Sequence, residues 1–261
     1  MKKLICVILI ILCAAFAGCS AFVRTNILDS ESPSLDENSQ FSANEAAYGW
    51  VMNVTDTSLL LCTEDNGLFW VSAKDIPLTD ENGTNIDIGN ISCADTVEVV
   101  YDGGIMETYP AMFSGVSGIR ITGHRSSLIT FYNDVLDRIY ETDSEINENT
   151  GMMAFDIAGL TNMSDAEKTA FVYLAGEKYG KEAFVSTYGD LKDHGYLTKD
   201  GGKYTDGLLI TITVTDTGMD DGFEFHISKW RSVDESVGFS ECIAKKSTES
   251  WSYDIGTIWH S

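Results

Sequence analysis

Lys229, Trp230 and Arg231 are the one segment in which basic and aromatic residues gather in an otherwise acidic chain. An indole beside a guanidinium and an ammonium group can hold an anionic or sugar-like ligand by stacking and by charge-assisted hydrogen bonds. The alternative is structural, with Trp230 in a core at a strand end and both cations paired with neighbouring carboxylates. The structural interpretation is favoured, and the three residues are kept as the hypothesis for a ligand-binding site.

Other residue spacings that carry chemistry are missing from the sequence. His124, His194, His226 and His260 form no i, i+4 pair and no cluster with cysteines, so we expect no metal. Neither a Gly-x-Ser-x-Gly elbow nor a phosphate-cradling glycine loop occurs, and the acidic clusters lack the order of a calcium-binding loop. The 40 carboxylates are too many to single out a catalytic pair. We therefore predict no cofactor and name no catalytic residue.

The N-terminus predicts lipid attachment at Cys19. Two lysines precede an uncharged apolar run over residues 4–17, which is shorter than the roughly 20 residues that span a bilayer. The segment Phe16-Ala17-Gly18-Cys19 resembles the lipobox of bacterial lipoproteins, with Phe16 in place of the usual leucine. The resemblance implies removal of residues 1–18, acylation of Cys19 and an anchor on the extracytoplasmic face of the cell membrane. The alternatives are an ordinary secretory signal and a short anchor.

The charge of the chain excludes one class of partner. It has 17 basic and 40 acidic residues and a formal net charge of −23. Nucleic acid requires a basic footprint, and an anionic membrane surface would repel this body, so the lipid is the expected attachment to the membrane. An envelope protein or a glycan is the expected partner.

Three cysteines remain after the predicted cleavage and acylation: Cys62, Cys93 and Cys242. A bridge between Cys62 and Cys93 is compatible with an oxidising exterior. Cys62 equally fits as a small buried apolar residue after three leucines. The two interpretations stay open.

Residues 19–44 are polar and read as a flexible tether, and residues 45–123 show short apolar strands separated by turns. Asn66-Gly67 predicts a two-residue hairpin turn. The expected strands are 48–54, 58–62, 68–73, 96–101 and 115–121. Five short strands suggest a small barrel.

Several sequence segments of this region resemble those of a known protein family. Gly49-Trp50-Val51, the segment from Ala94 to Gly103 and the segment from Ile105 to Ala111 are similar to OB-like β domains of unknown function in exported lipoproteins of Gram-positive type. The resemblance covers about a third of the chain and implies an OB-like barrel. Such barrels often bind oligomeric ligands on one face. Aromatic residues at alternating strand positions are more often core, and that role is favoured here.

Residues 126–261 predict an α+β domain, because helices are followed by a run of strands. A helix is expected from near Ser127, and Ser164 with Glu167 forms a capping box for a second helix that stops at Gly180. Thr187 with Asp190 caps a third, brief helix. The expected strands are 151–157, 183–186, 208–214, 223–227, 238–245 and 251–258.

The second half also resembles the region that follows the β domain in those uncharacterised lipoproteins, through residues 225–232, 242–246 and 251–256. Relatives commonly have glycines after the Trp-Arg-Ser segment, where this chain has residues 233–237 without glycine. We expect a lipid-anchored, non-enzymatic binding or interaction module. The alternatives are a cell-envelope hydrolase that uses carboxylates and a regulatory lipoprotein that sequesters a membrane partner.

Overall fold

The computed structural model describes residues 44–65, 67–215, 221–247 and 250–261, which belong to one compact unit. The predicted signal peptide, Cys19 and the tether up to residue 43 lie outside the described residues, as does Asn66 of the predicted hairpin turn. No described helix is long and apolar enough to cross a membrane.

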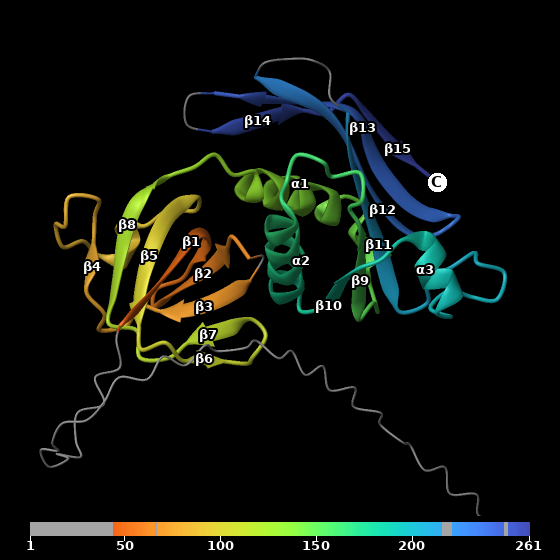
Figure 1. Ribbon diagram of the computed structural model, residues 1–261. Helices are drawn as coiled ribbons and strands as arrows, with labels where there is room; N and C mark the ends of the chain where they lie inside the picture. The colour runs from red at the N-terminus through yellow and green to blue at the C-terminus, as the bar shows by residue number, and fades with distance from the viewer. Residues whose placement is uncertain (1–43, 66, 216–220, 248–249) are drawn as a thin grey trace, which may run out of the picture. The chain divides into compact units, whose positions relative to one another are not determined.

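Two largely antiparallel sheets and a few helices confirm the predicted α+β class (Figure 1). The first sheet has the strand order β4-β8-β5-β1-β2-β3-β7-β6. It contains all five predicted strands and three short ones that the sequence pattern did not indicate, β4, β6 and β7. The bounds are β1 (Glu45–Val54), β2 (Ser58–Thr63), β3 (Leu68–Ser72), β4 (Leu78–Thr79), β5 (Asp95–Tyr101), β6 (Ile105–Met106), β7 (Ala111–Phe113) and β8 (Gly118–His124). A short 3-10 helix, η1 (Ile88–Asn90), precedes β5.

The predicted closed OB-like barrel is not confirmed, because the first sheet is open. Its order ends at β4 on one side and at β6 on the other, and no pairing between described strands joins the two ends. Strands β3 and β8 would have to meet to close the central five strands. Each pairs in parallel with a short strand instead, β3 with β7 and β8 with β4.

Strand β2 is buried on both faces. Leu59 and Leu61 belong to a core inside the first sheet, whereas Leu60 and Cys62 belong to a second core that includes α1 and α2. The thiol of Cys62 donates a hydrogen bond to the carbonyl of Ala166 at 3.2 Å. A strand buried on both faces reads as a continuous apolar run, which is why residues 59–62 do not alternate.

Gly49 of β1 allows close approach of β2. A Cβ added at Gly49 would lie 2.5 Å from the carbonyl oxygen of Cys62 on the paired strand. Any other residue would push β1 and β2 apart, so glycine is required here by space.

The second sheet has the order β10-β9-β11-β12-β13-β14, with β15 also paired to β13. The pairs of β9 with β10 and β11 are parallel, and the pairs from β11 to β15 are antiparallel. The bounds are β9 (Met152–Asp156), β10 (Glu182–Val185), β11 (Gly207–Thr215), β12 (Gly222–Ser232), β13 (Glu235–Lys246), β14 (Trp251–Asp254) and β15 (Thr257–His260).

The prediction of one strand over 251–258 is wrong, because β14 and β15 pair with different parts of β13. Between these parts, Glu241 of β13 has a positive φ of 56°. Opposite it, Gly256 lies so close that an added Cβ would be 2.4 Å from the carbonyl oxygen of Glu241. The irregularity in β13 therefore breaks its partner into two strands.

The helices begin and end close to where their capping residues predict. Ser164 accepts a hydrogen bond from the backbone of Glu167 at the start of α2, and Gly180 caps its end in the left-handed conformation. Thr187 and Asp190 form the same box at α3. The bounds are α1 (Ile129–Glu141), η2 (Ser144–Asn147, a 3-10 helix), α2 (Asp165–Tyr179) and α3 (Tyr188–Asp193).

Helices α1 and α2 share one apolar core with both sheets (Figure 1). Trp50 and Leu60 of the first sheet, Phe131 of α1, Phe171 of α2 and Phe225 of the second sheet all belong to it. A smaller core on the other face of the second sheet lies against α3. Division into folding units 45–123 and 126–261 stays a prediction, since the two sheets have this core in common.

Candidate functional site

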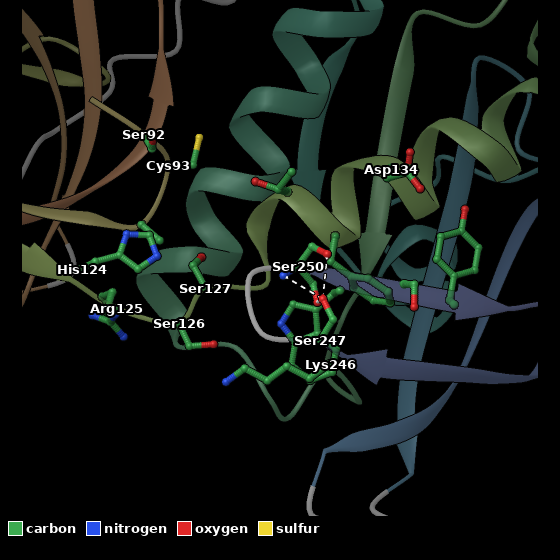
Figure 2. A pocket seen from close by; sticks show the side chains of 16 residues that line it. Ser92, Cys93, His124, Arg125, Ser126, Ser127, Asp134, Lys246, Ser247 and Ser250 are labelled. Atoms are coloured by element: carbon green, nitrogen blue, oxygen red, sulfur yellow. Dashed lines mark hydrogen bonds between the residues drawn. The ribbon is translucent and has the colours of Figure 1, made fainter. Parts of the chain in front are cut away.

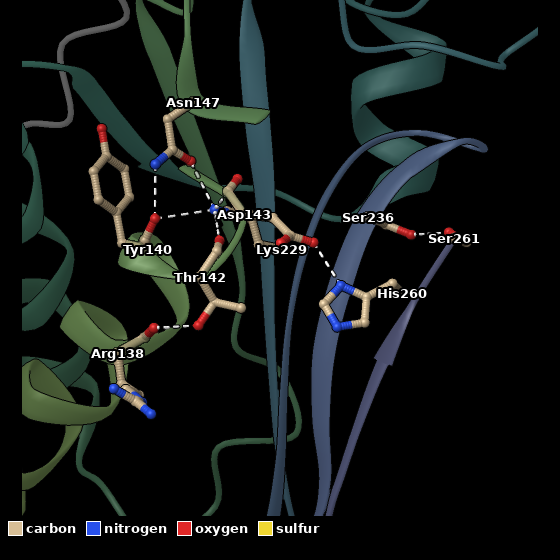
Figure 3. Close-up of polar contacts among 9 residues, drawn as sticks. All are labelled: Arg138, Tyr140, Thr142, Asp143, Asn147, Lys229, Ser236, His260 and Ser261. Carbon is tan, nitrogen blue, oxygen red and sulfur yellow. Dashed lines mark hydrogen bonds and ion pairs between the residues drawn. The ribbon is translucent and has the colours of Figure 1, made fainter. Parts of the chain in front are cut away.

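Lys229 of the predicted ligand site is a buried residue with no exposed surface. Its ammonium group lies within hydrogen-bond distance of four oxygens (Figure 3): the carbonyls of Tyr140 (3.0 Å), Thr142 (2.7 Å) and Asp143 (3.3 Å) and Oδ1 of Asn147 (2.9 Å). These carbonyls belong to the last turn of α1 and the residues after it, which intrahelical bonds leave without donors. Burial lowers the pKa of Lys229 to about 8. The lysine therefore joins β12 to the end of α1.

Trp230 lies on the opposite face of β12 from Lys229 and Arg231. It packs against the core on the α3 side and meets the ring of Tyr188 edge to face, with centroids 5.5 Å apart. Arg231 is mostly buried, and Nη1 donates to the carbonyl of Ile146 at 3.4 Å, next to the Asn147 that Lys229 contacts. The aromatic ring and the two cations therefore do not converge on a common space. Ligand binding by these residues stays a prediction.

A cleft of about 1170 Å³ is found instead between the ends of β5 and β8, the first turns of α1 and the β13–β14 hairpin (Figure 2). The side chains that line it include two cations and a histidine, several hydroxyls and three aromatic rings. Cys93 also lines it, and the described lining has a single carboxylate, Asp134. The hydroxyl-bearing residues are Ser92, Ser126, Ser127, Thr130, Ser247, Ser250 and Ser252.

His124, the last residue of β8, is oriented by Asp95. Its Nδ1 lies 2.8 Å from Oδ1 of the buried Asp95, whose other carboxylate oxygen accepts the backbone N–H of Ser92 at 2.7 Å. Because a carboxylate can only accept, Nδ1 carries the proton in this pair. The pair leaves Nε2 of His124 for another partner, and the imidazole itself is mostly exposed.

Arg125 is held by stacking. Its guanidinium carbon lies 4.1 Å above the ring centroid of Trp50, and its backbone N–H donates to the carbonyl of Ala94 at 3.0 Å. Stacking covers one face of the guanidinium and leaves its N–H groups directed outward in the plane. No carboxylate among the described residues lies within 4.0 Å of Arg125. Its positive charge is thus available at the cleft.

Two adjacent lysines at the end of β13 differ in their partners. Lys245 pairs with Asp254 at 2.6 Å, whereas Lys246 has no salt bridge to any residue that the structure describes. Neighbouring residues of a strand point to opposite faces. In Figure 2, the amine of Lys246 extends toward the side of the cleft that holds Ser126 and Arg125, and Asp134 lies on the other side.

Aromatic rings from β14 and α1 form the opposite wall. The ring of Phe131 lies 6.1 Å from that of Trp251 and 5.7 Å from that of Tyr253. Trp251 and Tyr253 are half-buried, so each presents an edge to the cleft. Burial, with a smaller contribution from Asp134, raises the pKa of Tyr253 to about 12, and its hydroxyl remains a hydrogen-bond donor at neutral pH.

Two groups in this cleft, the thiol of Cys93 and the hydroxyl of Ser127, could in principle act as nucleophiles, but both make hydrogen bonds within the protein. The thiol of Cys93 faces the carbonyl of Met52 at 3.5 Å, and burial raises its pKa, which disfavours the reactive thiolate. The hydroxyl of Ser127 donates to Oε1 of Glu167 and accepts the N–H of Ile129, both at 3.2 Å. Cys62, Cys93 and Cys242 are free, so Cys62 and Cys93 are not bridged. The arrangement favours binding over covalent catalysis.

Within the described ranges, no group of three or more His, Cys, Asp or Glu side chains is arranged to hold a metal ion. Comparison with known protein families finds no family model that matches the chain, and comparison with curated proteins finds no match.

The sequence analysis predicted none of the cleft residues to be part of a ligand-binding site. They come from three separate stretches, residues 92–95, 124–134 and 246–253. Arg125 follows a strand and Lys246 ends one, and neither carries a motif. The one available signal was that both are basic residues in a chain with more than twice as many acids as bases.

Proposed function

We propose that this protein is a lipid-anchored binding protein on the extracytoplasmic face of the cell membrane, and that it holds its ligand in the cleft beside His124 and Arg125. The observation that carries the proposal is the lining of this cleft. Arg125 and Lys246 supply cations, serines and Thr130 supply hydroxyl donors, and Phe131, Trp251 and Tyr253 supply an aromatic wall. Apolar walls with a few placed polar groups are typical of ligand sites.

The location and the family are proposed from the sequence. The N-terminal segment ending at Cys19 supports the anchor. The segments 49–51, 94–103 and 105–111 support membership of the uncharacterised lipoproteins with an OB-like β domain. The central strand order β8-β5-β1-β2-β3 supports an opened OB-like arrangement, since that fold is a five-stranded and partly open barrel. In this proposal the body is tethered to the membrane and presents its cleft to the envelope.

A cleft-filling substitution tests the site. Ser126 is an exposed residue between β8 and α1 that lines the cleft, and Ser72 is an exposed residue of β3 outside it (Figure 2). We expect Ser126→Trp to remove binding of soluble glycan fragments released from bacterial cell walls, measured by titration calorimetry on the full chain. The matched variant Ser72→Trp should bind like the unmodified protein.

Two results would contradict the proposed site. One is equal binding by the two tryptophan variants, which would place the ligand elsewhere. The other is the absence of binding by the unmodified protein to every fragment offered. Thermal unfolding of both variants shows that each is folded, because an added side chain at an exposed position changes stability little.

A further inference from the structure

We infer that the cleft recognises an anionic sugar, with the negative group of the sugar at the His124–Arg125–Lys246 side and its ring against the aromatic wall. This inference rests on the proposed function and adds the chemical class of the ligand. Three observations support it. The cleft has cationic residues although the chain is acidic, Arg125 is held against Trp50, and Asp134, the one carboxylate in the described lining, lies away from Arg125 and Lys246.

The charge of the cleft is opposite to that of the chain. The chain as a whole has 40 acidic residues against 17 basic ones. In the part of the lining that the structure describes, Arg125 and Lys246 stand against Asp134 alone. An acidic body repels anions at long range, so a cleft that accepts one must supply local cations that other carboxylates do not neutralise. Arg125 and Lys246, which pair with no carboxylate that the structure describes, meet that requirement.

Arg125 has the geometry of an anion receptor. Trp50, which is 7 % exposed, lies against the guanidinium, whose carbon is 4.1 Å from the ring centroid. A planar guanidinium donates two parallel N–H bonds to a carboxylate or a phosphate. Because the contact with this buried ring restrains Arg125 before the ligand arrives, less side-chain entropy is lost on binding.

His124 and Lys246 complete this side of the cleft. Asp95 holds Nδ1 of His124 at 2.8 Å, so Nε2 is the ring nitrogen left to contact a ligand. Lys246 adds a mobile point charge from the β13 side, and Figure 2 shows its amine extended toward Arg125. A negative group between them would meet a fixed fork, an imidazole and an ammonium.

The other wall suits a sugar ring. Trp251 and Tyr253 are held by Phe131 through ring contacts at 6.1 and 5.7 Å. Partly exposed aromatic rings bury the apolar face of a ligand, and the surrounding serines and Thr130 can bond to its hydroxyls. Asp134 on the far side of the cleft would repel a second negative group there.

The test compares sugars that differ in charge. Glucose 6-phosphate, glucuronate and glucose are titrated into the full chain at low salt by calorimetry. We expect the two anionic sugars to bind at least about 10-fold more tightly than glucose, and Arg125→Gln to remove this preference, so that its affinities for the three sugars become similar. The ratio between glucose 6-phosphate and glucuronate then distinguishes a phosphate from a carboxylate.

Matched lysine variants provide the control. Lys246→Gln should weaken both anionic sugars by about 3-fold or more, and Lys245→Gln should leave them unchanged, because Lys245 is paired with Asp254. Arg125→Lys keeps the charge without the planar fork and should retain part of the preference. It also shows whether loss of the Trp50 stack alone unfolds the protein.

Equal affinity for all three sugars would overturn the inference and leave the binding function in place. Loss of the charge preference in Lys245→Gln as well as in Lys246→Gln would also overturn it, since a general charge effect would explain both. Absence of any binding up to about 10 mM overturns it too. The Ser126→Trp experiment with wall fragments then shows whether the proposed function has failed with it.

Discussion

Replacing Lys229 by methionine tests how the end of α1 is held. Methionine has a similar length but no donor, so the carbonyl of Thr142 and Oδ1 of Asn147 lose the only hydrogen-bond donor that the structure shows for them. The other two oxygens keep a second donor: the Asn147 amide at 2.7 Å for Tyr140 and the N–H of Ile146 at 3.1 Å for Asp143. Two orphaned acceptors cost about 2 kcal/mol each, or roughly 4 kcal/mol in total.

The buried charge offsets most of that loss at neutral pH. Lowering the pKa from 10.5 to about 8 means that holding the protonated lysine in the folded state costs about 3 kcal/mol. Methionine does not have this cost. We therefore expect Lys229→Met to be only about 1 kcal/mol less stable than the unmodified protein at pH 7.

The difference in the free energy of unfolding between the unmodified protein and Lys229→Met should grow with pH, and its sign follows from the number of protons that the folded and unfolded states bind. Between about pH 8 and 10.5 the unfolded lysine is still protonated while the folded one has released its proton. Stability rises with pH wherever the unfolded state binds more protons, so the unmodified protein gains about 3 kcal/mol over this range and the variant does not. The neutral amine still donates two hydrogen bonds.

Urea unfolding of both proteins at intervals from pH 7 to 10.5 measures this difference, and the titrations common to both cancel. Lys203→Met is the matched control, because Lys203 is partly exposed and pairs with Glu235 at 2.7 Å. We expect that variant to lose under about 1 kcal/mol, with no rise toward high pH. A difference between Lys229→Met and the unmodified protein that stays constant or narrows with rising pH would refute the reasoning.

Two further predictions concern the anchor and the core. Cys19→Ser should abolish incorporation of labelled fatty acid, because no other cysteine lies at a predicted cleavage boundary; label that persists in the variant contradicts the anchor. Leu60→Ala should lower the free energy of unfolding by about 2–5 kcal/mol and shift a single unfolding transition as a whole, since Leu60 is fully buried in the core common to both sheets. The exposed Ile258→Ala serves as its control, and two separate transitions in calorimetry would mean that the sheets unfold independently.

The helices were predictable because their signals are local. Ser164 with Glu167 and Thr187 with Asp190 each mark a helix start within four residues, and the structure forms both boxes. The break within the 251–258 run was not predictable, because it depends on the positive φ of Glu241 in the neighbouring strand β13, which the residue type does not indicate. Whether the first sheet closes depends likewise on which strands pair with each other. The alternation of apolar and polar residues within one strand does not indicate its partners.

The candidate site was harder to predict for the same reason. A basic-aromatic run in the sequence pointed to residues 229–231, but successive residues of a strand face opposite ways, so Trp230 is separated from Lys229 and Arg231. The stack that matters joins Arg125 to Trp50, which are separated by most of the first sheet. Only packing of the sheets on α1 brings His124 and Arg125 toward Lys246.

The two-sided burial of β2 has a consequence for how the chain finds its correct pairing. In most sheets a slip by one residue is penalised because it moves apolar side chains into water. For residues 59–62 that penalty is small, since both faces lie in apolar cores. The space required at Gly49 supplies what the pattern lacks. In the observed register Gly49 pairs with Thr63 and lies against the carbonyl oxygen of Cys62, and a slip by one residue would put Tyr48 or Trp50 in this narrow position. Gly49 thus selects one register for β1 and β2, although the apolar composition of β2 alone is compatible with more than one.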